Sequence, residues 1–250
     1  MKTKKKRKTD LLVFAGNHIL MYEDVRQIRR IMTDNLIRRG LVKSACTITS
    51  ETYPVAGCTS CLKCFEDGEC FLDEEDSMKE IKRLALETEL ILFLIRGFGN
   101  EIPPEDLAVA ERLRIWNYSM PLIGKLGVTV TLIDEAGELF LSGYASKLLS
   151  AWGCGIVDEL IMRKGQVSEM VQMRMADQVC GRLEEYLSGR RRFEVPQSQD
   201  YYFQMSRRAV RKLEEDNFLK NSWRRRRMLD AVSLQNVFDE YFLKEEGERP

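Results

Sequence analysis

The feature of this sequence that most constrains its fold is a regular alternation of strand-like runs with amphipathic segments. Short runs of strand character fall at 10–15, 45–49, 90–95, 126–133 and 155–161. Segments with helical spacing of apolar residues follow at 24–39, 78–86, 103–116, 139–152 and 168–187. Such alternation predicts βαβ crossovers, and therefore an α/β domain whose parallel sheet has helices on both faces. In this class of fold, ligands bind at the carboxyl ends of the strands.

The chain is expected to consist of three parts. Residues 1–9 are a basic tail that we expect to be disordered, 10–189 form the α/β domain, and 190–250 form a helical extension. The extension is expected to contain linker segments at 190–192 and 196–200 and amphipathic helices at 201–220 and 225–241. Aromatic side chains on these helices need a surface to cover them, so we expect a homodimer or a higher homo-oligomer.

The charge balance and the hydropathy pattern limit the partners. Lysine plus arginine and aspartate plus glutamate both total 39, giving a formal net charge of zero. Because nucleic-acid binders are usually basic, we expect no nucleic-acid partner. The apolar stretch Leu11–Ala15 after the basic tail is far too short for a signal-peptide core or a membrane span. We therefore expect no membrane association and a cytoplasmic location.

Four of the seven cysteines, Cys58, Cys61, Cys64 and Cys70, have the spacing C-x2-C-x2-C-x5-C. They fall in a loop, 54–73, between the second strand and the second helix. Cytoplasmic cysteines are reduced thiols, so such a group indicates a metal site or a redox role. Successive x2 steps let a chain wrap around a cubane cluster, whereas zinc sites more often use two separated x2 pairs. The spacing favours a 4Fe-4S cluster over zinc, with unliganded thiols as a third alternative.

A four-cysteine motif after the second strand of an alternating α/β chain resembles the iron-sulfur flavoproteins, a group within the flavodoxin-like NAD(P)H-dependent FMN reductases. The resemblance covers about 10–187. It implies a flavodoxin-like five-stranded sheet of order 2-1-3-4-5, with Cys58, Cys61, Cys64 and Cys70 as the ligands of a 4Fe-4S cluster. Two shorter matches support it: Asp76-Ser77-Met78, where members carry Asp-Asp-Met, and Gly124-Lys125-Leu126-Gly127, which is similar to the family's Gly-Lys-x-Gly.

The loops that hold FMN in this family differ in the present sequence. After the first strand, members carry Gly-Ser-x-Arg and further hydroxyl residues that hold the phosphate, whereas this chain has Gly16-Asn17-His18. Glu23 and Asp24 at the start of the next helix would repel a phosphate. The resemblance implies that the site is either altered or abandoned. The residues it points to as FMN contacts are Gly16, Asn17, Arg96, Gly97 and Phe98, with Arg96 supplying positive charge and Phe98 stacking on the ring.

Two functions from different classes stay open. The resemblance implies a redox protein, an oxidoreductase that transfers electrons through a 4Fe-4S cluster and FMN, with NAD(P)H or ferredoxin as the donor. The alternative is a non-catalytic flavodoxin-like module with a structural zinc or an empty site, which binds a partner through its helical tail. The altered phosphate loop favours the second function, and the cysteine spacing favours the first.

Overall fold

The computed structural model describes residues 9–15, 22–97, 101–133, 141, 143–163 and 167–242. In this part of the chain five strands form one parallel sheet of order β2-β1-β3-β4-β5, which confirms the predicted flavodoxin-like topology. The strands are β1 (Thr9–Ala15), β2 (Val42–Ile48), β3 (Leu90–Arg96), β4 (Leu126–Ile133) and β5 (Gly155–Arg163). The strand order reverses between β1 and β3, and ligand crevices of doubly wound sheets open at such a point.

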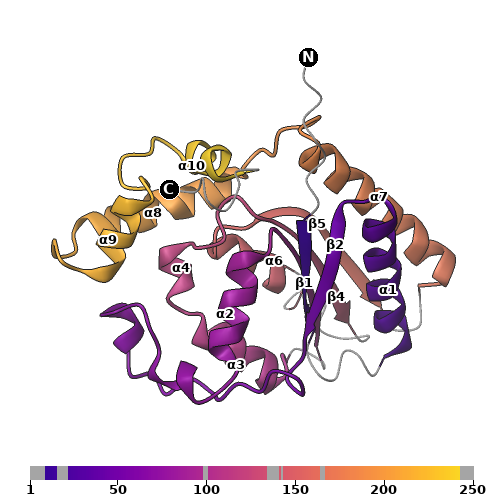
Figure 1. The fold of residues 1–250 in the computed structure, drawn as a ribbon, viewed down its shortest axis with the longest axis horizontal. Helices are drawn as coiled ribbons and strands as arrows, with labels where there is room; N and C mark the ends of the chain where they lie inside the picture. The colour runs from indigo at the N-terminus through magenta and orange to yellow at the C-terminus, as the bar shows by residue number, and fades with distance from the viewer. Residues whose placement is uncertain are drawn as a thin grey trace.

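Helices cover both faces of this sheet (Figure 1). On one face α1 (Glu23–Arg38) packs against α7 (Glu169–Leu187). The helices of the other face are α2 (Met78–Glu87), α3 (Pro104–Arg112), α4 (Trp116–Ser119) and α6 (Tyr144–Ala151). Every residue of β3 and β4 is buried, because both faces of these central strands meet an apolar helix layer.

Two elements of the domain differ from the sequence-based expectation. The helix expected over 103–116 is divided into α3 and α4 by a turn in which Leu113 and Ile115 become buried. Strand β2 begins at Val42, before the expected start at Ala45. This strand lies at the edge of the sheet and exposes Lys43, so its polar start does not look like a strand.

The C-terminal extension contains α8 (Gln197–Arg211), α9 (Phe218–Arg225) and α10 (Leu234–Tyr241). The helix expected over 201–220 is therefore two helices. Asn217 separates them, because its side chain accepts hydrogen bonds from the backbone N–H groups of Leu219 and Lys220 and so caps α9. Residues 197–200, expected to belong to a linker, form the first turn of α8 after Pro196.

Most aromatic side chains of the extension are buried or half-buried within the same chain, whereas Tyr201 is 67% exposed. Phe203 stacks on Trp223 with ring centroids 5.3 Å apart, and both side chains are fully buried. The Nε1–H group of Trp223 donates to the carbonyl of Tyr118 at 2.8 Å, and Phe238 lies against Gly155, the first residue of β5. The extension thus packs near the amino ends of the strands (Figure 1). These aromatic rings are therefore covered within one chain, whereas Tyr201, Met205 and Val232 of the extension stay exposed, and the homo-oligomer expected from the sequence stays a prediction.

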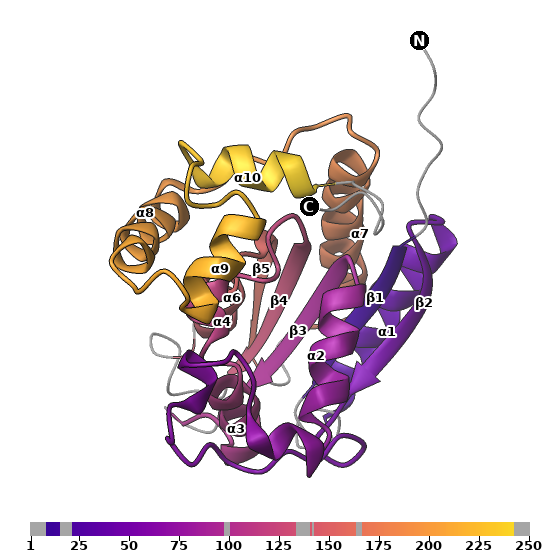
Figure 2. The same cartoon turned by 60° about the vertical axis from the view of Figure 1, so that its left-hand side comes forward.

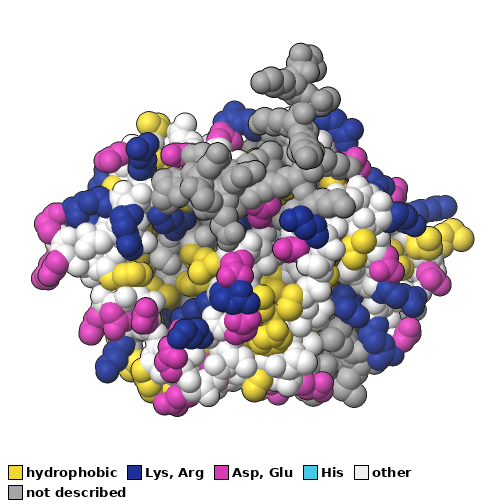
Figure 3. Space-filling model, viewed as in Figure 1, with side chains coloured by type: hydrophobic (Ala, Val, Ile, Leu, Met, Phe, Trp, Pro, Cys, Tyr) yellow, Lys and Arg dark blue, Asp and Glu magenta, His cyan; other side chains and the backbone are white. Residues whose placement is uncertain are grey.

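Two observations concern the surface and the helices of the described residues. No helix of the described ranges is long and apolar enough to cross a membrane. On the face seen in Figure 3, basic and acidic side chains are interspersed, without a broad region of one sign.

Candidate functional site

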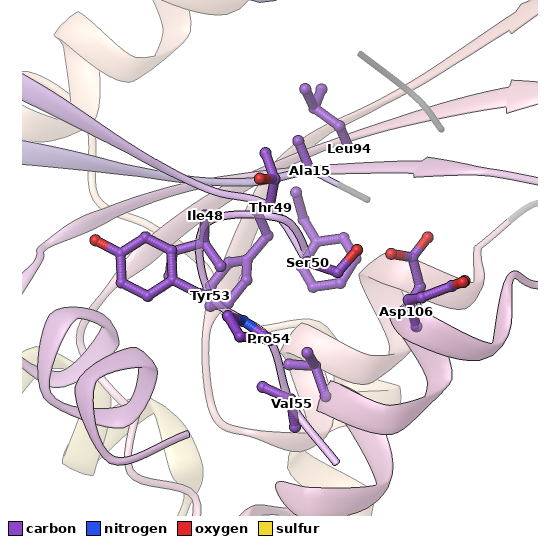
Figure 4. A pocket seen from close by; sticks show the side chains of 13 residues that line it. Ala15, Ile48, Thr49, Ser50, Tyr53, Pro54, Val55, Leu94 and Asp106 are labelled. Carbon is purple, nitrogen blue, oxygen red and sulfur yellow. The ribbon is translucent and has the colours of Figure 1, made fainter. Parts of the chain in front are cut away.

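A pocket opens at the carboxyl edge of the sheet, beside the reversal point between β1 and β3 (Figure 4). Phe14 and Ala15 of β1, Phe93 and Leu94 of β3, and the end of β2 form its floor. The walls are the loop after β2, with Thr49, Ser50, Tyr53, Pro54 and Val55, and the first turns of α3, with Glu105, Asp106 and Val109. The cavity has a volume of about 230 Å³. This is below the roughly 300–1,000 Å³ of most small-molecule sites, so it has room for one ring system and not for a whole nucleotide.

Asp106 is the ionisable group most perturbed by this pocket. Its carboxyl group points into the cavity from the first turn of α3 (Figure 4). Burial, followed by the charge of Glu105, raises the pKa of Asp106 to about 7. The side chain therefore exchanges between neutral acid and carboxylate near neutral pH. Sequence reasoning had assigned Asp106 only to the start of a helix. Its position, shortly after the third strand at the ligand-binding edge, was the available signal.

Arg96, one of the expected FMN contacts, lies near the amino end of α1. Its guanidinium carbon is 3.1 Å from the centroid of the Tyr22 ring, and Tyr22 is the N-cap residue of α1. A cation here adds to the positive potential of the helix N-terminus, which favours an anionic group. Glu23, expected to repel a phosphate, forms an ion pair with Arg26, and the hydrogen bond from Arg26 lowers the pKa of Glu23. The nearby acidic charge is thus partly offset.

Gly97, a second expected contact, is covered by another side chain. A Cβ atom on Gly97 would lie 1.6 Å from Cδ1 of Leu141, so only glycine allows this close packing. The face that Leu141 covers is closed to a flavin ring. The other expected contacts, Gly16, Asn17 and Phe98, lie outside the described residues. Their role in FMN binding stays a prediction.

The cysteine loop directs backbone N–H groups toward two of its sulfur atoms. The N–H of Ser60, a residue with φ of 56°, donates to Sγ of Cys58 at 3.4 Å. A hydrogen bond from the backbone of Lys63 lowers the pKa of Cys61. Burial raises the pKa of Cys64, and the charges of the other three cysteines add to this effect. The thiols of Cys58, Cys61 and Cys70 are therefore close enough to Cys64 to affect it electrostatically.

These thiols do not form a metal site in the structure. Among the described residues, no group of three or more histidine, cysteine, aspartate or glutamate side chains is placed to hold a metal ion. The four-thiolate site expected from Cys58, Cys61, Cys64 and Cys70 is thus not formed. Cys154 and Cys180, by contrast, are buried as packing residues, and burial raises the pKa of each to about 12.

Arg112 anchors the cysteine loop to the domain. Its fully buried guanidinium donates to Asp76 at 2.6 Å, to Asp73 at 2.8 Å and to the carbonyl of Ala56 at 3.0 Å. Asp76 also accepts from the N–H groups of Ala56 and Met78, each at 2.9 Å. Burial would raise the pKa of Asp76, but these hydrogen bonds hold it below its ordinary value. The Asp76-Ser77-Met78 match thus has a structural role at the start of α2.

The extension and α4 hold the outer part of the same loop. Phe218 of α9 lies against Gly68, where a Cβ atom would come within 2.2 Å of its ring. Gly68 has φ of 87°, a left-handed conformation that favours glycine. Phe65 packs edge-on against Tyr118 of α4, with ring centroids 5.5 Å apart. The cysteine loop, α4 and α9 therefore form one packed unit, which can be followed in Figure 2.

Comparison with solved structures shows that other proteins share this fold. The chain is similar to an NAD(P)H:quinone oxidoreductase from Methanothermobacter marburgensis, with a TM-score of 0.51 and 10% identity over 72% of this chain and 97% of that one. It is also similar to an NADH:FMN oxidoreductase in its apo form, with a TM-score of 0.50 and 13% identity over 77% of this chain and 94% of that one. No protein-family model and no curated protein matches the sequence. At these identities the likeness shows a flavodoxin-like fold.

Proposed function

We propose that this protein is a flavin-dependent oxidoreductase that holds the ring of FMN in the pocket between β1, β3 and α3. The observation that carries the proposal is the position and lining of this pocket: an apolar and aromatic cavity at the reversal point of a doubly wound sheet. The printed names of the two similar structures, an NAD(P)H:quinone and an NADH:FMN oxidoreductase, support FMN as the cofactor and a reduced nicotinamide as the donor.

Different residues of this chain would contact the ring and the phosphate of FMN. Phe14, Phe93 and Tyr53 supply aromatic and apolar surface for the ring. Arg96, at the end of β3 and beside the start of α1, supplies positive charge toward the phosphate. Bound flavin would exchange electron pairs with a nicotinamide and pass them singly or in pairs to an acceptor. Because Leu141 covers Gly97, the ring would enter from the α3 side of the sheet edge.

A titration of FMN fluorescence and absorbance tests this proposal. The expected result is saturable binding with a perturbed flavin spectrum, followed by oxidation of NADH or NADPH in the presence of a quinone. Val109→Trp should abolish binding, because the indole would fill the cavity next to Asp106. Glu111→Trp, at an exposed position on the same helix, is the matched control and should bind FMN as the wild type does. No saturable binding by the wild type would overturn the proposal.

We further propose that the cysteine loop closes around a 4Fe-4S cluster when iron and sulfide are supplied. The supporting observation is that backbone N–H groups already point at Cys58 and Cys61, as they do around sulfurs that carry negative charge. Closure requires the four sulfurs to move closer together than they are here.

Metal and sulfide analysis of anaerobically purified protein tests the cluster. Iron and acid-labile sulfide in equal amounts, lost in Cys64→Ser and kept in Cys180→Ser, are expected, since Cys180 is buried on α7. Zinc without sulfide would support the alternative of a structural zinc module instead. Protein free of both metals would mean that the thiols are unliganded. A homodimer, the other partner expected from the sequence, is tested by light scattering on the same sample.

A further inference from the structure

Two polar side chains, Ser50 and Asp106, line the candidate flavin pocket. Among the described residues, the buried hydroxyl of Ser50 has no hydrogen-bond partner. Burial, followed by the charge of Glu105, raises the pKa of Asp106, and among the described residues no hydrogen bond to its carboxyl group lowers that pKa. Figure 4 shows Ser50 on the loop after β2 and Asp106 on α3, both directed into the cavity. A buried polar group in a native protein is normally hydrogen-bonded, so the Ser50 hydroxyl is placed for a ligand, and the half-buried carboxyl group of Asp106 lines the same cavity.

We propose that Ser50 and Asp106 are the specificity-determining pair of the pocket, and that neutral Asp106 binds an adjacent N–H and C=O on an uncharged planar heteroaromatic ring. The inference rests on the proposed function, since the flavin ring carries such an imide edge at its N3–H and flanking carbonyls. It adds which edge of the ring is recognised, and by which residues. The Ser50 hydroxyl donates to, or accepts from, a further polar atom of the same ring.

The chemistry of a carboxyl group explains this selectivity. A neutral carboxyl group donates one hydrogen bond and accepts another, which matches an adjacent C=O and N–H. A carboxylate can only accept hydrogen bonds. Its oxygen would therefore face the ring carbonyl oxygen, another acceptor, with no proton between them. The apolar lining from Phe14, Phe93 and Val109 makes an unmatched acceptor costly. An anionic ligand would be disfavoured in the same place.

The groups around Asp106 favour its neutral form. On α3, the neighbouring Glu105 carries negative charge and raises the pKa of Asp106. On α6, burial raises the pKa of Tyr144, and the charge of Asp106 is the next largest cause. From the loop after β2, Tyr53 is the titratable side chain that lines the pocket. Within the described ranges no cation contributes to the pKa of Asp106, which is raised to about 7. Ligand affinity should therefore be full below this pH and fall above it.

Binding of lumiflavin, the flavin ring without its phosphate chain, tests the inference over about pH 5.5 to about pH 8.5. For the wild type, the dissociation constant should rise above about pH 7 and approach a tenfold increase per pH unit. 3-Methyllumiflavin, in which the N–H is blocked, should bind more weakly than lumiflavin below about pH 7, because neutral Asp106 then has no N–H from which to accept. Asp106→Asn, whose amide both donates and accepts, should bind lumiflavin with a flat pH profile and keep the wild-type circular dichroism spectrum.

Three further variants sharpen the test. Glu105→Gln should move the midpoint of the wild-type profile to lower pH, because it removes a charge that raises the pKa of Asp106. Ser50→Ala should weaken binding about fivefold at every pH, the effect of one lost hydrogen bond. Glu111→Gln, exposed on α3, should leave the profile unchanged.

Two results would overturn the inference and can be told apart. If wild type and Asp106→Asn bind lumiflavin with the same pH profile, Asp106 does not select the ring, while the proposed function stands. If the wild type shows no saturable flavin binding at any pH tested, the proposed function fails and this inference fails with it.

Discussion

Replacement of Arg112 by alanine should release the cysteine loop from the domain. The guanidinium group is fully buried and neutralises Asp73 and Asp76, whose side chains are only 12% and 10% exposed. It also donates to the carbonyl of Ala56 inside the loop. Without Arg112, two nearly buried carboxylates lose this cation, and the loop loses a tie to α3.

The expected loss of stability is about 3 kcal/mol. Removal of one partner from a buried ion pair costs about 3–5 kcal/mol. The lower end applies here, because Asp76 keeps two backbone donors and Asp73 keeps its ion pair with Lys82. Since the pKa of Asp76 is held below its unfolded value, the stabilisation is present above about pH 4 and is lost as the pH falls through the folded pKa. The cost of the substitution should therefore be largest near neutral pH and shrink in acid.

Urea unfolding followed by circular dichroism measures this cost, at about pH 7 and again at about pH 3.5. Limited proteolysis mapped by mass spectrometry should show new cleavage between residues 54 and 76. Arg83→Ala is the matched control, because its ion pairs with Glu80 and Glu87 are half exposed and should be worth less than about 0.5 kcal/mol. A loss below about 1 kcal/mol for Arg112→Ala, or an unchanged cleavage pattern, would refute the anchoring role.

Three further predictions concern packing and thiol reactivity. Gly68→Ala should lower the free energy of unfolding by about 1–3 kcal/mol, because it combines a left-handed φ with a clash against Phe218. The control Gly189→Ala, with φ of 70° and open space around it, should cost only about 1 kcal/mol. Equal losses in urea melts would contradict the packing of α9 on the cysteine loop. Phe203→Ala should cost about 3–5 kcal/mol in thermal or urea unfolding, since the ring is fully buried on Trp223, and a loss under about 1 kcal/mol would mean that the extension is not docked. Iodoacetamide should alkylate exposed Cys61 in the folded protein and react with Cys154 and Cys180 only after unfolding, because burial raises the pKa of Cys154 and Cys180 to about 12. Labelling of Cys154 in the folded protein, detected by peptide mass spectrometry, would contradict this order.

The central sheet could be predicted because its physical cause is local in the sequence. Strands β3 and β4 are covered on both faces, so each appears as a continuous run of residues suited to burial, and the expected bounds of β4 coincide with the observed ones. The edge strand β2 meets solvent along part of its length, and its polar start was missed for that reason. The strand order followed from alternation together with the family resemblance.

The extension and the site depended on contacts that no local pattern records. The aromatic faces of α8 and α10 indicated burial, but a sequence does not show whether the covering surface belongs to the same chain, as it does for Phe203 and Phe238. The pocket joins the ends of β1, β2 and β3 with the start of α3, so the raised pKa of Asp106 appears only after these segments meet. The cysteine spacing places four thiols in one loop, but it does not determine the direction in which each sulfur points.

A crystal structure of the protein grown with FMN would show where the flavin ring binds. We expect density for the isoalloxazine ring in the cavity between Tyr53 and Asp106, with the phosphate near Arg96, beside the start of α1. Ring density at any other surface, with Ser50 and Asp106 making no contact to it, would contradict flavin binding in this pocket.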